Sequence, residues 1–162
     1  MNLAVIGSGG REHAICYKLK QSPKIKRLFC IPGNAGTKKI AKNIKEDISN
    51  FDALYEIIKK QNIDLVVVGP EQPLVDGLVD YLNKKKVKVF GPNKFASQLE
   101  GSKAFMKNLC KKNNIPTANF GTFNNINEAS GFIKKVGVPI VVKADGLAAG
   151  KGVSICKSEE EA

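Results

Sequence analysis

Short apolar runs alternate with helical patterns along the first 92 residues of the chain. Continuous apolar runs predict strands at 2–6, 27–31, 64–68 and 87–90. Helical spacing of apolar residues, as at Phe51, Leu54, Ile57 and Ile58, predicts helices at 11–21, 51–61 and 74–82. Strands that alternate with helices through short loops are typical of an α/β protein. We therefore expect a doubly wound, Rossmann-like parallel sheet.

A second unit is expected after a helical stretch at 94–114. Glu100, Gly101 and Ser102 predict a break within that stretch, before a helix at 103–112. The pattern that follows predicts a strand at 119–123, a helix at 127–136, and strands at 139–143 and 153–156 around a glycine-rich loop. Ser158 and Glu161 have the spacing of a capping box, which predicts a further helix. We therefore expect the second domain to continue beyond residue 162.

Composition excludes several protein classes. Hydrophobic residues make up 43% of the 162 residues, which is ordinary for a globular protein. No apolar run approaches the roughly 18 residues of a membrane span, and the N-terminus lacks the basic region of a signal peptide. The cysteines are far apart in the sequence, which favours reduced thiols in the cytoplasm over disulfides or a metal site.

The formal charge of +11 raises the question of nucleic-acid binding. Only Arg11 and Arg27 are arginines, and the lysines are spread over several predicted helices. Base readout and phosphate recognition favour the planar guanidinium. We therefore expect small-molecule partners rather than nucleic acid or a membrane.

The segment 141–153 carries the clearest chemical signal. Its loop holds three glycines, Gly146, Gly150 and Gly152, and lysines at Lys143 and Lys151. Glycine lets the backbone approach a phosphate closely, and the ammonium groups supply charge. The spacing differs from a P-loop, because three residues separate Gly146 from Gly150 and no Ser or Thr follows the lysine. The segment indicates a grip on a nucleoside triphosphate; the alternative is a hairpin loop with solvated lysines.

The first glycine turn follows the first predicted strand. A dinucleotide fingerprint is disfavoured, because Glu12 occupies its third glycine position and the second strand lacks a terminal acidic residue. A single phosphate at the helix N-terminus fits better, held by the N–H groups of Gly9 and Gly10 and by Arg11. The alternative is a tight turn with Arg11 in solvent.

Other polar residues follow the predicted strands at the same edge of the sheet, where ligands of doubly wound sheets bind. Gly69 and Glu71 follow the third strand, and Asn34 lies in the turn after the second. Glu71 is suited to accept hydrogen bonds from sugar hydroxyls; otherwise it is a carboxylate at a helix start. His13 is the only histidine, and a surface or core role is the more ordinary interpretation.

Several motifs together resemble one family. They lie in order along the whole chain, at 7–14 (GSGGREHA), 32–37 (PGNAGT), 67–78 (VVGPEQPLVDGL), 90–92, 99–107 (LEGSKAFMK) and 141–153 (VVKADGLAAGKGV). The chain resembles the N-terminal portion of the phosphoribosylamine–glycine ligases, also called glycinamide ribonucleotide synthetases, which are ATP-grasp enzymes of purine biosynthesis. The segments PGNAGT and VVKADGLAAGKGV are the most specific.

This resemblance implies a pre-ATP-grasp domain at 1–100 that holds phosphoribosylamine and the start of an ATP-grasp domain at 101–162. The implied substrate-binding residues are Gly9, Gly10, Arg11, Asn34, Gly69 and Glu71. The implied ATP-binding residues are Lys103, Lys143, Gly146, Gly150, Lys151 and Gly152. ATP and Mg²⁺ are the implied cofactors. We expect the magnesium ligands in a missing C-terminal part, and no catalytic nucleophile or metal ligand in this chain.

The implied reaction joins glycine to 5-phosphoribosylamine through a glycyl phosphate, giving glycinamide ribonucleotide, ADP and phosphate. We expect the full-length protein to be a monomer and the 162-residue chain alone to be inactive. Two alternatives stay open. One is another ATP-grasp ligase that phosphorylates a different carboxylate, and the other is a non-catalytic nucleotide-binding module.

Overall fold

The computed structural model describes residues 1–148 and 150–162. These residues form two units, Met1–Ser97 and Gln98–Ala162. Helix α5 (Lys94–Gly101) contains the boundary between them.

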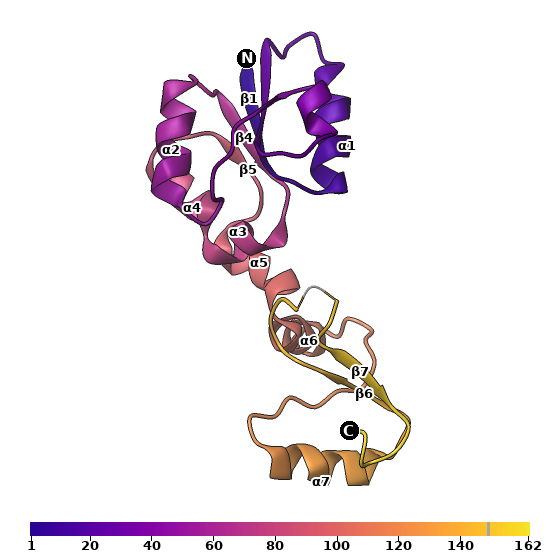
Figure 1. Ribbon diagram of the computed structural model, residues 1–162. Coiled ribbons are helices and arrows are strands. Elements are labelled where there is room, and N and C mark those ends of the chain that lie inside the picture. The colour runs from indigo at the N-terminus through magenta and orange to yellow at the C-terminus, as the bar shows by residue number, and fades with distance from the viewer. Residues whose placement is uncertain (149) are drawn as a thin grey trace. The chain divides into compact units, whose positions relative to one another are not determined.

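Five parallel strands form the sheet of the first unit (Figure 1). They are β1 (Asn2–Gly7), β2 (Arg27–Pro32), β3 (Lys42–Asn43), β4 (Leu65–Val68) and β5 (Val89–Phe90). Their order is β3-β2-β1-β4-β5, so the chain reverses direction across the sheet at β1. In the centre, Val5 is in register with Cys30 on one side and with Val67 on the other. The predicted doubly wound parallel sheet is confirmed.

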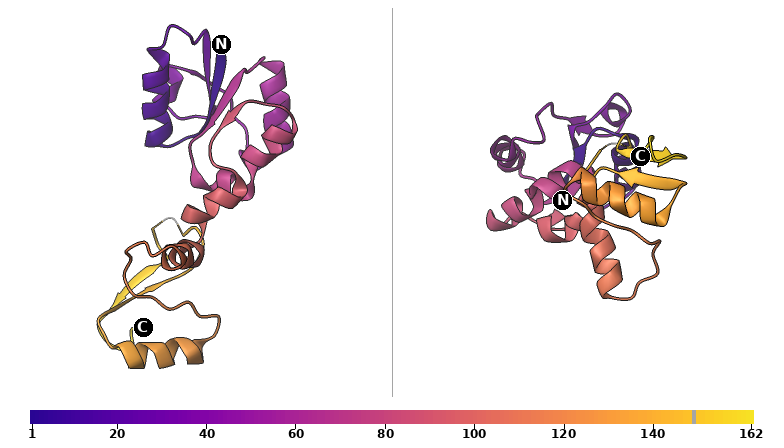
Figure 2. Two further views of the ribbon diagram at one scale, coloured as in Figure 1. Left: turned by 180° about the vertical axis from the view of Figure 1, so that it is seen from behind. Right: turned by 90° about the horizontal axis from the view of Figure 1, so that it is seen from below.

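Helices cover both faces of this sheet (Figures 1 and 2). Helix α1 (Gly10–Lys20) lies on one face, and α2 (Phe51–Lys60) and α4 (Leu78–Lys84) lie on the other. Asn50 caps α2, because its side chain accepts a hydrogen bond from the Ala53 N–H at 3.1 Å. A short 3₁₀ helix, η1 (Thr37–Lys39), precedes β3.

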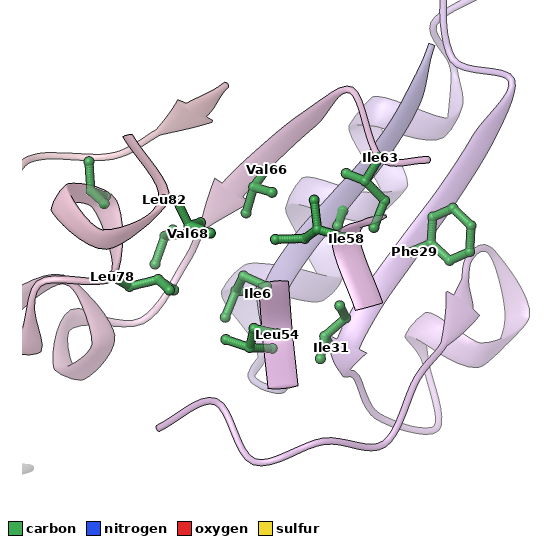
Figure 3. Packing of buried hydrophobic residues seen from close by; sticks show 12 residues of the cluster. Ile6, Phe29, Ile31, Leu54, Ile58, Ile63, Val66, Val68, Leu78 and Leu82 are labelled. Carbon is green, nitrogen blue, oxygen red and sulfur yellow. The ribbon is translucent and has the colours of Figure 1, made fainter. Parts of the chain in front are cut away.

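The alternation of side chains along β1 supplies both halves of the core. Ala4 and Ile6 point toward α2 and α4, where they join the larger buried cluster shown in Figure 3. Leu3 and Val5 point the other way and pack with Cys16 of α1. Because β1 is buried on both faces, its sequence is a continuous apolar run.

The predicted single helix at 74–82 is instead two helices. Helix α3 (Glu71–Asp76) ends at Gly77, and α4 begins one residue later. Gly77 is buried and has a φ of +98°, a left-handed conformation that stops the first helix. Leu78 and Leu82 then face the core from the new helix axis.

Among its described residues, the second unit contains the end of α5, the helices α6 and α7, and a hairpin. Helix α6 (Lys103–Lys112) is capped by Ser102, and α7 (Ile126–Val136) by Asn125. Strands β6 (Ile140–Lys143) and β7 (Val153–Cys156) pair antiparallel, with Lys143 opposite Val153. The break at 100–102 and the two hairpin strands agree with the sequence prediction.

Two predictions for this unit are wrong. Residues 119–123 form no strand, and side-chain contacts hold this stretch of the chain. Lys107 donates hydrogen bonds to the Thr117 hydroxyl at 2.6 Å and the Ala118 carbonyl at 3.0 Å, and Phe123 packs on Phe132. After Ser158 the chain forms a turn rather than a helix. The Ser158 hydroxyl does accept from the Glu161 N–H, as in a capping box.

No helix in the described part of the chain is long and apolar enough to cross a membrane. Cys16, Cys30 and Cys156 are buried free thiols, and Cys110 is a partly buried one.

Candidate functional site

A pocket of about 340 Å³ lies at the carboxyl end of β1, in the first unit. Its volume is within the range of small-molecule sites. Its walls come from the glycine turn, the start of α1 and the start of α3. The lining residues are Gly7, Ser8, Gly9, Gly10, Arg11, Glu12, Ile48, Pro70 and Glu71.

The buried side chain of Glu12 supports the glycine turn, which is formed by residues 7–10 after β1. Glu12 is only 4% exposed, and its carboxylate accepts a hydrogen bond from the Gly9 N–H at 2.7 Å. A Cβ on Gly69 would lie 2.3 Å from Glu12 Oε1, and a Cβ on Gly7 would lie 2.6 Å from Glu12 Cγ. Gly7 and Gly69 therefore leave the space that this buried carboxylate fills.

Arg11, at the start of α1, links the turn after β1 to the segment that follows β4. One guanidinium nitrogen lies 2.8 Å from Glu71 Oε1, and another donates to the Gly69 carbonyl at 2.8 Å. The hydrogen bond from Arg11 holds the pKa of Glu71 below its usual range. The ion pair therefore stands at the mouth of the pocket, with 57% of the Arg11 side chain and 39% of the Glu71 side chain exposed.

Asn34 is bound into the loop rather than pointing freely into the pocket. Its side-chain amide donates to the Ser8 carbonyl at 2.8 Å and to the Gly9 carbonyl at 3.3 Å. Its side-chain oxygen accepts from the Thr37 N–H at 2.9 Å. The PGNAGT turn thereby holds the glycine turn in place.

The six residues predicted for the first site thus lie together, in two roles. Gly9, Gly10, Arg11 and Glu71 line the pocket, whereas Gly69 and Asn34 hold those residues from outside it. The phosphate contact predicted for the Gly9 N–H must be revised, because that group already donates to Glu12. Gly10 is the first residue of α1, where a backbone N–H has no acceptor within the helix.

His13 packs beside this loop. A Cβ on Gly36 would lie 2.7 Å from the His13 ring, so the imidazole rests against the backbone of the PGNAGT turn. This position agrees with a packing role.

The second predicted site is the loop between β6 and β7. Hydrogen bonds from Ala144 N–H to the Gly152 carbonyl (2.9 Å) and from Lys151 N–H to the Ala148 carbonyl (2.8 Å) shape it. Gly146 and Gly150 have φ values of +89° and +78°, with open space where a Cβ would stand. The open space leaves their backbone accessible to a ligand. At Gly152 a Cβ would instead lie 2.6 Å from that of Ala148.

Three lysines were predicted to serve this loop. The Lys103 ammonium donates to the Gly146 carbonyl at 2.8 Å, so α6 and the loop meet. Lys143 and Lys151 are exposed, and in the described part of the chain their ammonium groups form no hydrogen bond or ion pair. The structure therefore brings Lys103 to the loop and leaves the other two ammonium groups in solvent.

Asp145 is a loop residue that the sequence patterns did not single out. Its carboxylate accepts hydrogen bonds from the Ser102 hydroxyl and the Ala104 N–H, both at the start of α6. Its only sequence signal is a position between Lys143 and the first loop glycine.

The residues of this loop have features that suit phosphate oxygens. Positive charge and open glycines are present at the loop, as phosphate oxygens require. Within residues 1–148 and 150–162, no group of three or more His, Cys, Asp or Glu side chains is placed to hold a metal.

Comparison with protein-family models gives two matches. The model described as phosphoribosylglycinamide synthetase, N domain, matches residues 1–100. The model described as phosphoribosylglycinamide synthetase, ATP-grasp (A) domain, matches residues 101–162.

Curated relatives and solved structures agree with these matches. A phosphoribosylamine–glycine ligase of Mesorhizobium japonicum is 49% identical over 100% of this chain and 38% of its own length. The ligase of Clostridium acetobutylicum is 50% identical over 97% and 38%. The crystal structure of the Thermotoga maritima ligase has a TM-score of 0.77 and 35% identity, covering 99% of this chain and 37% of its own. The chain thus spans less than two fifths of these relatives.

A more distant structure shows the shared fold alone. A biotin carboxylase–ATP analogue complex from Campylobacter jejuni has a TM-score of 0.77 at 18% identity, over 99% of this chain and 39% of its own.

Proposed function

The chain belongs to the phosphoribosylglycinamide synthetase family, and from that membership we propose that the full-length protein joins glycine to 5-phosphoribosylamine with ATP. The γ-phosphoryl group of ATP passes to the glycine carboxylate, and the sugar amine then displaces phosphate to form the amide. The products are glycinamide ribonucleotide, ADP and phosphate. One observation carries the proposal: the pocket at the glycine turn, with an arginine and a carboxylate at its mouth.

The pocket suits a phosphorylated sugar amine. A phosphate at the start of α1 would gain from the N–H of Gly10, the helix dipole and the Arg11 guanidinium. Glu71, held ionised by Arg11, accepts hydrogen bonds from hydroxyl or amine groups. Gly9, Gly69 and Asn34 contribute by holding this arrangement.

The hairpin loop and its lysines would hold ATP. Lys103, Lys143 and Lys151 supply charge to the phosphates, and the open backbone at Gly146 and Gly150 supplies N–H donors. Gly152 keeps the loop closely packed. Magnesium would neutralise charge on the transferred phosphoryl group. We place its ligands in the part of the ligase that this chain lacks.

The remaining assignments follow from the same proposal. We assign residues 1–100 to the domain that holds phosphoribosylamine and 101–162 to the start of the ATP-grasp domain. Small molecules are the partners, and a monomeric protein in the cytoplasm accords with this chemistry.

Arginine variants test the first site. Ribose 5-phosphate is a stable probe for the phosphosugar, and its binding is followed by the thermal shift of the protein. We expect Arg11→Ala to lose this shift and Arg27→Ala, which removes the other arginine, to retain it. Arg27 donates instead to the Gln61 carbonyl at 2.9 Å. Equal losses in both variants would reject the assignment.

The carboxylate that triggers phosphate release distinguishes the proposed ligase from another ATP-grasp ligase. A ligase that phosphorylates another carboxylate, such as bicarbonate, would release phosphate from ATP with that anion and without glycine. We expect phosphate release by the full-length protein only when glycine and phosphoribosylamine are both present. A non-catalytic nucleotide-binding module would release none under either condition.

A further inference from the structure

We propose that Asp145 is a positioning residue, which ties the glycine loop to the start of α6 and so sets Lys103 and the loop against the phosphates of ATP. This inference rests on the proposed function for its ligand. It adds a residue that makes no phosphate contact of its own.

Consecutive loop residues contact consecutive residues of the helix start. Asp145 Oδ1 accepts from the Ala104 N–H at 3.2 Å, and Asp145 Oδ2 accepts from the Ser102 hydroxyl at 3.0 Å. Next to it, the Gly146 carbonyl accepts from the Lys103 ammonium at 2.8 Å. These contacts join segments more than 40 residues apart in sequence, so they fix the loop in space rather than shape it locally.

The same contacts place the carboxylate charge at a helix N-terminus. Asp145 is exposed, and its carboxylate lies at the start of the ten-residue helix α6, where the dipole and the Ala104 N–H stabilise its charge. Desolvation alone would raise the pKa of Asp145, but these hydrogen bonds outweigh it and lower the pKa. The carboxylate is therefore held ionised against the helix.

Lys103 can serve the loop and a ligand together. An ammonium group has three donors, and the Gly146 carbonyl accepts from one of them. The contact holds the lysine beside the loop while leaving donors for phosphate oxygens. Loss of Asp145 would leave the Lys103 contact as the remaining described hydrogen bond between the loop and the start of α6.

Among the described residues, the other hydrogen bonds of the loop are internal. They run from Ala144 to Gly152 and from Lys151 to Ala148. They preserve the hairpin shape but do not connect it to α6. The hydrogen bonds between the loop and the start of α6 thus come from Asp145 and from Lys103.

The tether is tested first without nucleotide, by amide hydrogen exchange on the 162-residue chain. Asp145→Ala removes the hydrogen bonds of this carboxylate with the Ser102 hydroxyl and the Ala104 N–H. Asp145→Asn keeps an oxygen that can accept from Ala104. Asp80→Ala is the matched control, because the Asp80 carboxylate accepts from the Lys94 N–H at 2.7 Å in the other unit. We expect the Ala144 and Lys151 amides to exchange about tenfold faster in Asp145→Ala only. Unchanged exchange at both amides would overturn the tether.

The positioning role is tested by steady-state kinetics of the full-length ligase. We expect Asp145→Ala to raise the KM for ATP about tenfold, with the KM for phosphoribosylamine unchanged, and Asp145→Asn to recover most of the loss. Equal rises for both substrates would show a general loss of structure and overturn the role. A wild-type protein that does not consume ATP would reject the proposed function, while the exchange result would still decide the tether.

Discussion

A buried carboxylate and the glycines around it depend on one another at the first loop. Glu12 occupies the position where a dinucleotide fingerprint has glycine, and its side chain fills the space beneath Gly7, Gly9 and Gly69. The sequence predicted that this loop differs from a dinucleotide site. It did not predict that the carboxylate itself supports the turn.

A Cβ at Gly69 should displace that carboxylate. We expect Gly69→Ala to lower the free energy of unfolding by about 1–3 kcal/mol, because Glu12 must leave its hydrogen bond with Gly9. Gly10→Ala is the control, since nothing lies within 4 Å of its Cβ position. Urea unfolding measures both variants. Equal stability of the two would contradict the tight fit around Glu12.

The ion pair at the pocket mouth should add a small, pH-dependent stability. The folded-state pKa of Glu71 is lowered by Arg11, so its contribution is present above the unfolded pKa and lost as the pH falls through the folded pKa. Both side chains are partly exposed, so we expect about 0.5 kcal/mol at neutral pH. The difference in unfolding free energy between wild type and Glu71→Gln should shrink as the pH falls below the usual carboxyl range and disappear once Glu71 is protonated in the folded state. A difference that persists after this protonation would reject this cause.

Sequence reasoning identified the residues at this site better than their roles. Glycine and arginine at a strand end predicted the loop, because glycine permits a tight turn and arginine offers several hydrogen-bond donors. Asn34 was expected to contact substrate, yet its amide is used by backbone groups of two loops. Such long-range hydrogen bonds leave no periodic pattern in a sequence. The role of Asp145 could not be predicted for the same reason, because its partners Ser102 and Ala104 are more than 40 residues away.

At the scale of elements, the long apolar patterns predicted well and the short segments did not. Helix α2 and strands β1, β2 and β4 follow their patterns closely. Strand β3 has two residues, too few to show alternation. Residues 119–123 are not a strand in the described part of the chain, although the sequence pattern there predicted one.

Gly77 should be essential to the break between α3 and α4. We expect Gly77→Ala to cost about 1–2 kcal/mol, because an L-residue at a φ of +98° is strained. Gly131→Ala within α7 should instead stabilise by about 0.5–1 kcal/mol, since its Cβ position is open. Thermal unfolding of the two variants should show shifts of opposite sign. Shifts of the same sign would mean that space rather than φ decides the effect at Gly77.

A phenol–carboxylate contact joins α2 to α4. The Tyr81 hydroxyl donates to the Asp52 carboxylate, which raises the pKa of Tyr81 to about 12. We expect Asp52→Asn to bring this titration down toward the ordinary value, as measured by phenolate absorbance. Tyr81→Phe assigns the signal among the tyrosines. If Asp52→Asn leaves the titration unchanged, the raised pKa has another cause.

At the scale of the whole molecule, we expect the glycine-rich loop between β6 and β7 and its lysines to bind a triphosphate only weakly on their own. We expect the 162-residue chain to release no glycine-dependent phosphate and to bind Mg-ATP poorly. Phosphoryl transfer needs metal ions that neutralise charge, and we propose that their ligands lie outside these 162 residues. The measurement is phosphate release with Mg-ATP, glycine and phosphoribosylamine, beside the full-length protein. Comparable turnover by both would show that the catalytic groups lie within this chain.

The strand order also bears on how the chain is made. Every strand that pairs with β1 or β4 lies before residue 91, and the first unit ends at Ser97. A ribosome that has released this segment has supplied every strand of the parallel sheet. Domains generally fold as units during synthesis. The pocket at the start of α1 can therefore take shape on the nascent chain while the β6–β7 hairpin is still being translated.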